Sequence, residues 1–302
     1  MNYECTGTSI TFHNTNRFET ILDFLEHYKQ SKKNRYLLLL NKQLYLNDIV
    51  VKDVHEKING KDIKLLLENH DIDWIIGKKP CTVLYKDDFI LAVHKDAGCI
   101  IHGEENDQDC LNAQVARYFK DNNIHTSVRP LHRLDKDTTG IVLYSLIPFF
   151  QPYLDQAMEE KKIHRAYLAI TYGNKKVGSC FDIHQAIGKD RHVSNKYRIS
   201  SNGKDALTHV EIIEKKDNYE LVRCILETGR THQIRVHLSS NGLPIVNDPM
   251  YGKPSRDFKK MGLFAYEISF FDPVNENKIN ISDKFLKDYL FFDFCNIVTN
   301  KK

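Results

Sequence analysis

The sequence lacks the patterns that mark several classes of protein. Its seven cysteines are odd in number, scattered, and form no Cys-x-x-Cys pair. This argues against a disulfide framework or a zinc ribbon and favours a reducing compartment. No window approaches the roughly 18 apolar residues of a membrane helix, and the start of the chain has no basic flank followed by an apolar core. We therefore expect a cytoplasmic protein.

Glycine-rich loops for phosphates or dinucleotides are also missing. The net charge of only +3 and the pI near 8.3 permit a polyanionic partner without demanding one. The chain has 302 residues, of which 41% are hydrophobic and 27% charged. This is ordinary for a globular protein, and the length allows two unequal domains.

The first 70 residues predict a small unit of helices and strands. Apolar residues at helical spacing predict a helix over 16–28 with Asn16 as its N-cap, and 36–40 fits a second helix. Alternation over 44–51 predicts two strands broken at Asn47-Asp48, and Asn59-Gly60 predicts a tight turn before 63–67. A basic cluster in this unit is either a solvated face or an RNA contact: Lys29, Lys32, Lys33 and Arg35.

This unit loosely resembles the small RNA-binding module first described in a small-subunit ribosomal protein, in which two short helices present basic residues to phosphates. Asn41 and Asn47-Asp48 stand where that module usually has Gly and Asn-Gly. The polar segment that ends at Lys78-Lys79-Pro80 marks a boundary. We therefore expect an RNA-binding-like module over residues 1–78 and a second domain over residues 79–302.

The second domain is predicted to consist mainly of strands. Asp87-Asp88 separates two apolar runs, as in a buried hairpin. Periodicity predicts helices over 110–119 and 152–161. Further strands are predicted over 166–171, 206–213 and 219–227, and closing core elements over 263–271 and 285–294.

Residues 129–140 form a charged segment that leads directly into the apolar run 141–144. Asp135 lies in this segment between Arg133 and Lys136. A carboxylate in such a place is either a functional group or a salt-bridged loop residue that ties two strands together. The residues alone leave both interpretations open.

A second charged segment, residues 227–242, joins a predicted strand to a predicted helix. Thr231 is placed to cap the start of this helix, and Gly242 is placed to end it in a left-handed conformation. Arg230 and Arg235 lie near the helix N-terminus. The segment therefore predicts a corner that attracts anions.

Two rival chemistries fit the sequence poorly. A metal site would draw on His132, His232 and His237, but the last two are five apart and diverge by about 140° in a helix of roughly 3.6 residues per turn. We therefore expect no metal. A glycosidase needs two carboxylates across a sugar, whereas Asp135 and Asp137 are only two apart and are flanked by basic residues.

From about residue 80 onward the chain resembles the RluA-type pseudouridine synthases, which modify large-subunit rRNA and tRNA. It departs from the family pattern at Asp96, Thr139, Asn247 and Phe264, where Pro, Ser, Gly and His are usual. The resemblance is carried by five motifs in order: His132-Arg133-Leu134-Asp135 with Thr138-Thr139-Gly140, Arg165-Ala166-Tyr167-Leu168-Ala169, Gly203-Lys204-Asp205-Ala206 with Thr208, Thr228-Gly229-Arg230-Thr231-His232-Gln233-Ile234-Arg235-Val236-His237, and Pro244-Ile245 with Asp248, Tyr251 and Gly252.

The resemblance implies an α+β fold in which the catalytic domain is a mainly antiparallel, bent mixed β-sheet with flanking helices. It implies an isomerase that cleaves the N-glycosidic bond of a uridine, turns the uracil and rejoins it through carbon 5, with no cofactor. Asp135 would be the essential carboxylate, as nucleophile or as base at the ribose. Tyr167 would stack on the uracil and assist proton removal, and Arg235 would pair with Asp135 and keep it ionised.

The partner would be RNA, with 23S rRNA favoured and tRNA as the alternative, and the protein would be a monomer. A uridine in folded RNA must be extruded, and phosphate contacts offset part of that cost. Two other functions stay open: a non-catalytic RNA-binding or ribosome-assembly factor on the same fold, and a glycosidase of free nucleosides. Residues expected to contact the substrate or RNA are Arg129, His132, Arg133, Thr138, Arg230, Thr231, His232 and Gln233.

Overall fold

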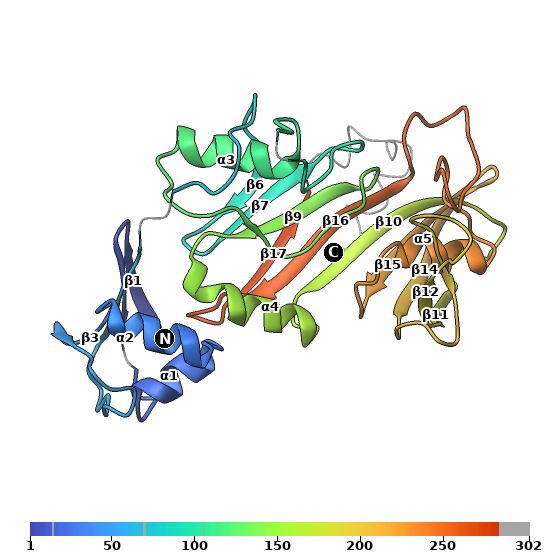
Figure 1. The fold of residues 1–302 in the computed structure, drawn as a ribbon. Helices are drawn as coiled ribbons and strands as arrows, with labels where there is room; N and C mark the ends of the chain where they lie inside the picture. Colours follow the sequence, from blue (N-terminus) through green and yellow to red (C-terminus); the bar gives the residue numbers. More distant parts are fainter. Residues whose placement is uncertain (14, 69–70, 105, 284–302) are drawn as a thin grey trace.

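The computed structural model describes residues 1–283 except 14, 69, 70 and 105 (Figure 1). It is a mixed α/β structure in which a five-stranded sheet at the N-terminus is followed by a large ten-stranded sheet. The closing element predicted over 285–294 lies outside the described residues. None of the described helices is long and apolar enough to cross a membrane.

The N-terminal sheet has the strand order β1-β2-β5-β3-β4, and all of its pairs are antiparallel. Its last three strands follow the prediction, and Asn47 and Asp48 adopt positive φ in the turn between β3 and β4. The first two strands lie where none is predicted. The strands are β1 (Asn2–Thr6), β2 (Ser9–His13), β3 (Leu44–Leu46), β4 (Ile49–Val50) and β5 (Ile63–Leu66).

Two helices lie between β2 and β3: α1 (Ile21–His27) and α2 (Lys32–Leu40). The prediction of Asn16 as the first N-cap is wrong, because Thr20 caps α1. The Thr20 side chain accepts a hydrogen bond from the Asp23 backbone, and the Asp23 carboxylate accepts one from the Thr20 backbone in return. Such a reciprocal cap contributes about 1 kcal/mol to the helix start.

Aromatic side chains join the N-terminal unit to the large sheet. The rings of Phe24 and Tyr28 lie 6.0 and 5.3 Å from the ring of Phe149, measured between centres. Gln30 Nε2 donates to the Phe149 carbonyl oxygen over 2.6 Å. Phe24 and Tyr28 are fully buried, and burying a ring of this size contributes roughly 1.5–3 kcal/mol. The two parts of the chain therefore share one continuous core.

The large sheet has the order β11-β14-β15-β10-β16-β9-β7-β6, with β17 paired to β16 and β8 paired to β9. The pair of β9 with β16 is parallel, and the other pairs in this sheet are antiparallel. The predicted hairpin is formed by β6 and β7, the strands predicted near 166, 206 and 219 are β10, β14 and β15, and the closing core element predicted over 263–271 is β16. The strands are β6 (Thr82–Lys86), β7 (Ile90–Lys95), β8 (Arg129–Pro130), β9 (Thr139–Ser145), β10 (His164–Tyr172), β11 (Cys180–His184), β14 (Leu207–Lys216), β15 (Tyr219–Leu226), β16 (Leu263–Phe271) and β17 (Lys278–Ser282).

Gly140 lets β9 and β16 approach closely just after the segment that contains Asp135. Its φ of +124° is a conformation that side chains rarely adopt, and a Cβ at this position would lie 2.2 Å from the Ala265 carbonyl oxygen. Gly140 pairs with Ala265 in the parallel register. The position therefore requires glycine for both conformation and space.

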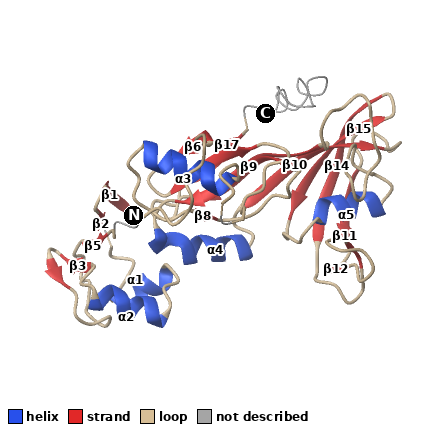
Figure 2. Cartoon of the chain, turned by 45° about the horizontal axis from the view of Figure 1, so that its top comes forward, coloured by secondary structure: helices blue, strands red, loops and turns tan. Residues whose placement is uncertain are grey.

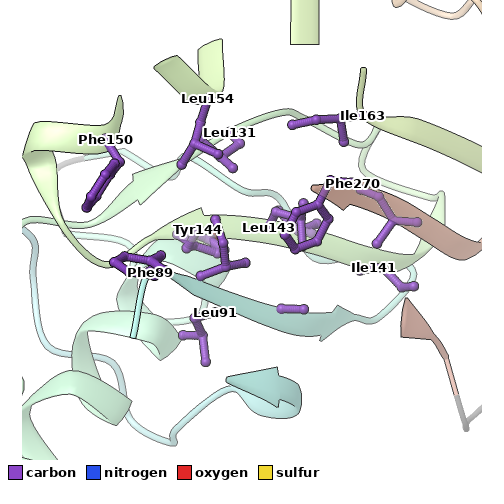
Figure 3. Packing of buried hydrophobic residues seen from close by; sticks show 14 of the residues in the cluster. Phe89, Leu91, Leu131, Ile141, Leu143, Tyr144, Phe150, Leu154, Ile163 and Phe270 are labelled. Carbon is purple, nitrogen blue, oxygen red and sulfur yellow. The ribbon is translucent and has the colours of Figure 1, made fainter. Parts of the chain in front are cut away.

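Helices cover parts of the large sheet, and its core lies beneath them (Figure 3). The predicted helices at 110–119 and 152–161 are α3 (Leu111–Asp121) and α4 (Gln151–Glu159), the latter preceded by a 3-10 turn, η1 (Pro148–Phe150). Leu154 of α4 lies close to Leu131 over β9, and both side chains are buried. Beneath these helices, strands β7 and β9 are buried along their whole length.

A small hairpin, β12 (Ile187–Lys189) with β13 (Tyr197–Ile199), lies in the connection from β11 to β14 and was not among the predicted strands. It extends beside α5 (Gln233–Ser240), as Figure 2 shows. Ile187, Ala206 and Val236 form a small separate core between the hairpin and this helix. The hairpin is thus packed against the helix that carries Arg235.

Candidate active site

Asp135 lies in the loop between β8 and β9, and backbone hydrogen bonds hold this loop in place. The Asp135 carbonyl oxygen accepts from the Thr138 amide over 3.1 Å. The carbonyl oxygen of Lys136 accepts from the Gly98 amide at 2.9 Å and from Lys95 Nζ at 2.8 Å. Lys95 is fully buried, and this burial lowers its pKa to about 8. The loop is therefore tied to the end of β7.

Arg235 lies in the first turn of α5, whose start differs from the prediction. His232 is the N-cap residue, with φ of 59°, and its side chain makes no capping hydrogen bond. Thr231 is exposed and lies one residue earlier, so its assignment as the cap is wrong. Gln233 closes the turn instead, because its Oε1 accepts from the Arg230 amide over 3.0 Å.

Arg235 joins two carboxylates from different segments. Its Nη1 donates to Asp135 Oδ2 over 2.9 Å, across 100 residues of sequence. Its Nε and Nη2 donate to Oδ2 and Oδ1 of Asp248 over 2.7 and 2.9 Å. This bidentate contact suits the planar guanidinium. The Asp248 side chain is fully buried, whereas the Asp135 side chain is 27% exposed, so Asp135 is the carboxylate that a ligand can reach.

The charges in this group support one another. Burial works against the charge on Asp248, but hydrogen bonds from Arg235 hold its pKa below the usual range. Burial also works against the charge on Arg235, yet its hydrogen bonds to Asp248 and the nearby charge of Asp135 raise its pKa. Asp248 therefore orients the guanidinium and keeps it charged beside Asp135.

Tyr167 and Arg165 lie two residues apart on β10 and line the same cleft as Asp135. Tyr167 is almost fully buried, and its burial, with a smaller effect of Asp135, raises its pKa, so the phenol keeps its proton at neutral pH. The Arg165 guanidinium lies beside Gly229, where a Cβ would be 3.1 Å from Arg165 Nη1. Arg165 Nε is buried and has no hydrogen-bond partner among the described residues.

The structure brings Asp135, Tyr167 and Arg235 together in a small cleft of about 70 Å³. They come from a loop, a strand and a helix that are distant in sequence. A larger cleft of about 500 Å³ lies elsewhere, between α2 and residues 146–149, and contains none of the predicted site residues. The smaller cleft is therefore the candidate active site. Its lining also includes Arg133, Thr138, Arg230, His232 and Gln233.

Three arginines predicted to contact RNA are exposed, and two of them line this cleft. Arg133 is part of the lining, and Arg230, also in the lining, donates from Nε to the Asp205 carbonyl oxygen over 2.8 Å. Arg129 lies on β8 outside the lining, and its Nε donates to Ser127 Oγ over 2.6 Å. Their contacts with RNA stay predictions.

Two other predicted contact residues are engaged inside the protein. His132 is buried and its Nε2 accepts from the Leu143 amide over 3.3 Å. Burial, with a smaller effect of the Arg165 charge, lowers the pKa of His132 to about 3. Gln233 Nε2 donates to Leu207 and Thr208 oxygens, both at 3.0 Å. His132 therefore supports the loop that contains Asp135, and Gln233 supports the turn at the start of α5.

His232 and His237 have separate environments. His232 Nε2 lies 3.8 Å from Asp135 Oδ2. His237 Nε2 donates to the Gln185 carbonyl oxygen, and its Nδ1 pairs with Thr208 Oγ1, both over 2.9 Å. Burial lowers the pKa of both imidazoles. Over the described ranges, no group of three or more His, Cys, Asp or Glu side chains is arranged to hold a metal ion.

A family model for RNA pseudouridylate synthases matches residues 89–240, a range that contains Asp135, Tyr167 and Arg235. The chain belongs to this family. It is therefore an isomerase that acts on uridine in RNA, and the resemblance to the RluA-type pseudouridine synthases is confirmed.

Relatives of this synthase carry the same activity in their names. An uncharacterised RNA pseudouridine synthase of Bacillus subtilis, YhcT, is 32% identical over 86% of this chain and 82% of its own length. The ribosomal large subunit pseudouridine synthase D of Xanthomonas campestris is 34% identical over 67% of this chain and 65% of its own length. Among solved structures, human RNA pseudouridylate synthase domain containing 1 has a TM-score of 0.57 at 26% identity, covering 70% of this chain and 86% of its own.

Two residues of this synthase site were not predicted from the sequence. Arg165 could have been found, because side chains two apart on a strand share a face and Tyr167 was already a candidate. Asp248 gave no such signal, since its role depends on the tertiary contact with Arg235. Asp248 belongs to the last motif of the resemblance, but that motif did not indicate that Asp248 contacts Arg235.

Proposed function

We propose that this synthase converts a uridine in folded RNA to pseudouridine with Asp135 as the essential carboxylate. The observation that carries the proposal is the 2.9 Å hydrogen bond from Arg235 to Asp135, which holds a partly exposed carboxylate in the cleft beside Tyr167. In this reaction the bond from N1 of uracil to C1′ breaks and a bond from C5 to C1′ forms. C5 loses a proton and N1 gains one, so the atoms balance without a cofactor.

Asp135 acts as a nucleophile at C1′ or as a base at the ribose, and both roles need an ionised carboxylate. Arg235 supports either role, because an adjacent cation favours the charged form. The contact with Arg235 uses Oδ2. Oδ1 makes no hydrogen bond to any of the described residues, which leaves this oxygen for the ribose.

Tyr167 provides a surface on which the uracil stacks. Its ring lines the cleft with Asp135, and an aromatic face suits the flat base that must leave the RNA stack. Because the pKa of Tyr167 is raised, chiefly by burial, the phenol is a hydrogen-bond donor at neutral pH rather than a ready base. Tyr167→Phe should therefore retain far more activity than Tyr167→Ala.

The RNA is large-subunit rRNA, with tRNA as the alternative. Relatives named ribosomal large subunit pseudouridine synthase D support this choice. Arg129, Arg133 and Arg230 contact phosphates around the target uridine. Residues 1–78 form an RNA-binding module beside a catalytic domain of residues 79–302, and exposed Lys32 and Lys33 at the start of α2 contribute to it.

The experiment is to map pseudouridines in rRNA and tRNA from wild-type cells and from cells that lack the gene, by carbodiimide modification and primer extension. Loss of one or a few sites in large-subunit rRNA, restored by the wild-type gene and not by Asp135→Asn, is the expected result. Identical maps in the two strains would contradict the proposed activity. Loss of sites in tRNA alone would refute the choice of rRNA and leave the chemistry standing.

A further inference from the structure

The hairpin of β12 and β13 emerges at the end of the sheet where the active site lies. Leu226 of β15 pairs with Arg165 on one side and with Thr208 on the other, and Leu207 pairs with His184. The connection that carries the hairpin, residues 185–206, therefore starts and ends level with Arg165. The loop at 173–179 leaves β10 at the opposite end of the strand.

This hairpin carries a concentrated positive charge. Lys189, Arg191, Lys196 and Arg198 lie within ten residues, and Asp190 is the only carboxylate between 187 and 199. Asp190 is engaged locally, since its Oδ1 accepts from the His192 amide over 2.8 Å. Lys189, Arg191 and Arg198 are exposed. Lys196 Nζ lies 5.6 Å from the centre of the Tyr251 ring.

These four cations have no salt-bridge partner in the part of the chain that the structure describes. Several cations elsewhere do have one. Arg17 and Arg35 each lie 2.8 Å from a glutamate oxygen. An unpaired group of cations beside an active cleft attracts a polyanion, and the substrate of this enzyme is one.

Hydrogen bonds link the hairpin backbone to His232, whose imidazole lies close to Asp135. The Tyr197 amide donates to the Tyr251 hydroxyl oxygen over 2.8 Å, and that hydroxyl lies 2.9 Å from His232 Nδ1. Since the oxygen already accepts from Tyr197, its own proton is available to donate to Nδ1. If the hydroxyl donates this proton to Nδ1, the imidazole proton is on Nε2, which lies 3.8 Å from Asp135 Oδ2.

We propose that the hairpin, residues 187–199, binds the phosphate backbone of the RNA strand next to the target uridine, and that Tyr251 and His232 couple its position to Asp135. The inference rests on the proposed function, because it assumes that RNA enters this cleft. Tyr251 is a positioning residue, since it acts through His232. Sequence-independent phosphate contacts of this kind set register and orientation on the RNA.

The first test measures binding of a fluorescent 20-nucleotide oligouridylate to the full chain over a range of KCl concentrations. The variant Lys189→Gln/Arg191→Gln should bind more weakly, and the slope of log K against log salt should become shallower by roughly 1.4, because each contact to a single strand contributes about 0.7. The control Lys175→Gln/Lys176→Gln removes two charges from the loop at the far end of β10 and should leave affinity and slope unchanged. Equal slopes for the hairpin variant and wild type would overturn the proposal.

The second test asks whether Tyr251 fixes the tautomer of His232. Long-range proton–nitrogen NMR spectra of the full chain, with the His232 signal assigned through His232→Gln, should show the proton on Nε2. Tyr251→Phe should populate the other tautomer, while Tyr172→Phe, which removes a hydroxyl bonded to the Pro254 carbonyl, should not. A proton on Nδ1 in the wild type, or no change in Tyr251→Phe, would refute the link. Neither test needs turnover, so both can fail or succeed apart from the proposed activity.

Discussion

Arg235 reaches Asp135 with one nitrogen while its other two hold Asp248 in a bidentate contact. The guanidinium is thus fixed by a buried carboxylate and presented to a partly exposed one. This arrangement explains how a lone aspartate in a loop acquires a defined orientation. It also separates two roles, since Asp248 determines where the cation lies and Asp135 faces the cleft.

Arg235→Lys is expected to lower the rate of pseudouridine formation by roughly 10- to 100-fold. Lysine keeps the charge but has no fork, so it cannot hold both carboxylates at once, and a charge-assisted hydrogen bond contributes about 1.5–3 kcal/mol. Single-turnover kinetics on the mapped RNA measures the effect. Arg117→Lys, which changes an exposed arginine paired with Asp121, is the control and should be neutral. An Arg235→Lys rate equal to that of wild type would show that the fork is dispensable.

Asp248→Asn is expected to destabilise the protein by about 3 kcal/mol or more in urea unfolding. The substitution keeps the shape but leaves the buried guanidinium with less compensating charge, and breaking a buried pair in this way typically costs about 3–5 kcal/mol. Since the pKa of Asp248 is depressed in the folded protein, its contribution is present above the unfolded pKa and lost as the pH falls through the folded value. Wild type and variant should therefore converge in stability at strongly acidic pH. A constant difference across pH would contradict this account.

Gly140→Ala is expected to be poorly folded, because the new Cβ would meet backbone atoms of Ala265 at the junction of β9 and β16. Gly178→Ala is a matched control, since Gly178 also has positive φ, at +82°, but its Cβ would meet nothing within 4 Å. Gly178→Ala should lower the free energy of unfolding only through its unfavourable positive φ, by about 1–2 kcal/mol. Thermal unfolding of both variants compares the two. An equal loss of stability in the two variants would show that the close approach of Gly140 to Ala265 does not require glycine.

Strands β3 to β7, β10, β14 and β15 and the main helices could be predicted because their apolar residues follow the period of the element. The start of α5 could not, because Gln233 closes its turn from inside the helix while Thr231, a common capping residue, stays exposed. The first helix gave a similar error, since Thr20 and Asp23 form the cap and Asn16 lies outside it. In both cases several polar residues compete for one role, and only tertiary packing selects among them.

The site was predicted where its residues belong to recognisable motifs and missed where their role depends on tertiary contacts. Asp135, Tyr167 and Arg235 belong to motifs that can be recognised in a sequence, and the cleft contains all three. Asp248, Arg165 and the charged hairpin depend on contacts between segments that no local pattern reveals. The tertiary fold determines these contacts, and the spacing of the residues along the sequence does not reveal them.

The stability of the protein should fall as the pH is lowered from about 6.5 towards 3, partly through His132. Its pKa is about 3 in the folded protein because of burial, against 6.5 when unfolded, so the unfolded state binds more protons over this window. His132→Gln keeps an acceptor for the Leu143 amide and should reduce the slope by up to about 1.4 kcal/mol per pH unit. His27, whose pKa burial lowers to about 4, continues to contribute in the variant. Identical slopes in urea unfolding from pH 6 to 4 would contradict the assignment.

The central claim is tested most directly by release of tritium from RNA labelled at carbon 5 of uridine, because pseudouridine formation expels the C5 hydrogen. The RNA is taken from cells that lack the gene, and wild type is compared with Asp135→Asn and with Asp137→Asn, the neighbouring carboxylate that is not part of the cleft lining. We predict release by wild type and by Asp137→Asn, and none above background by a folded Asp135→Asn. Tritium release by Asp135→Asn at a rate comparable to wild type would contradict the assignment of Asp135 as the essential carboxylate.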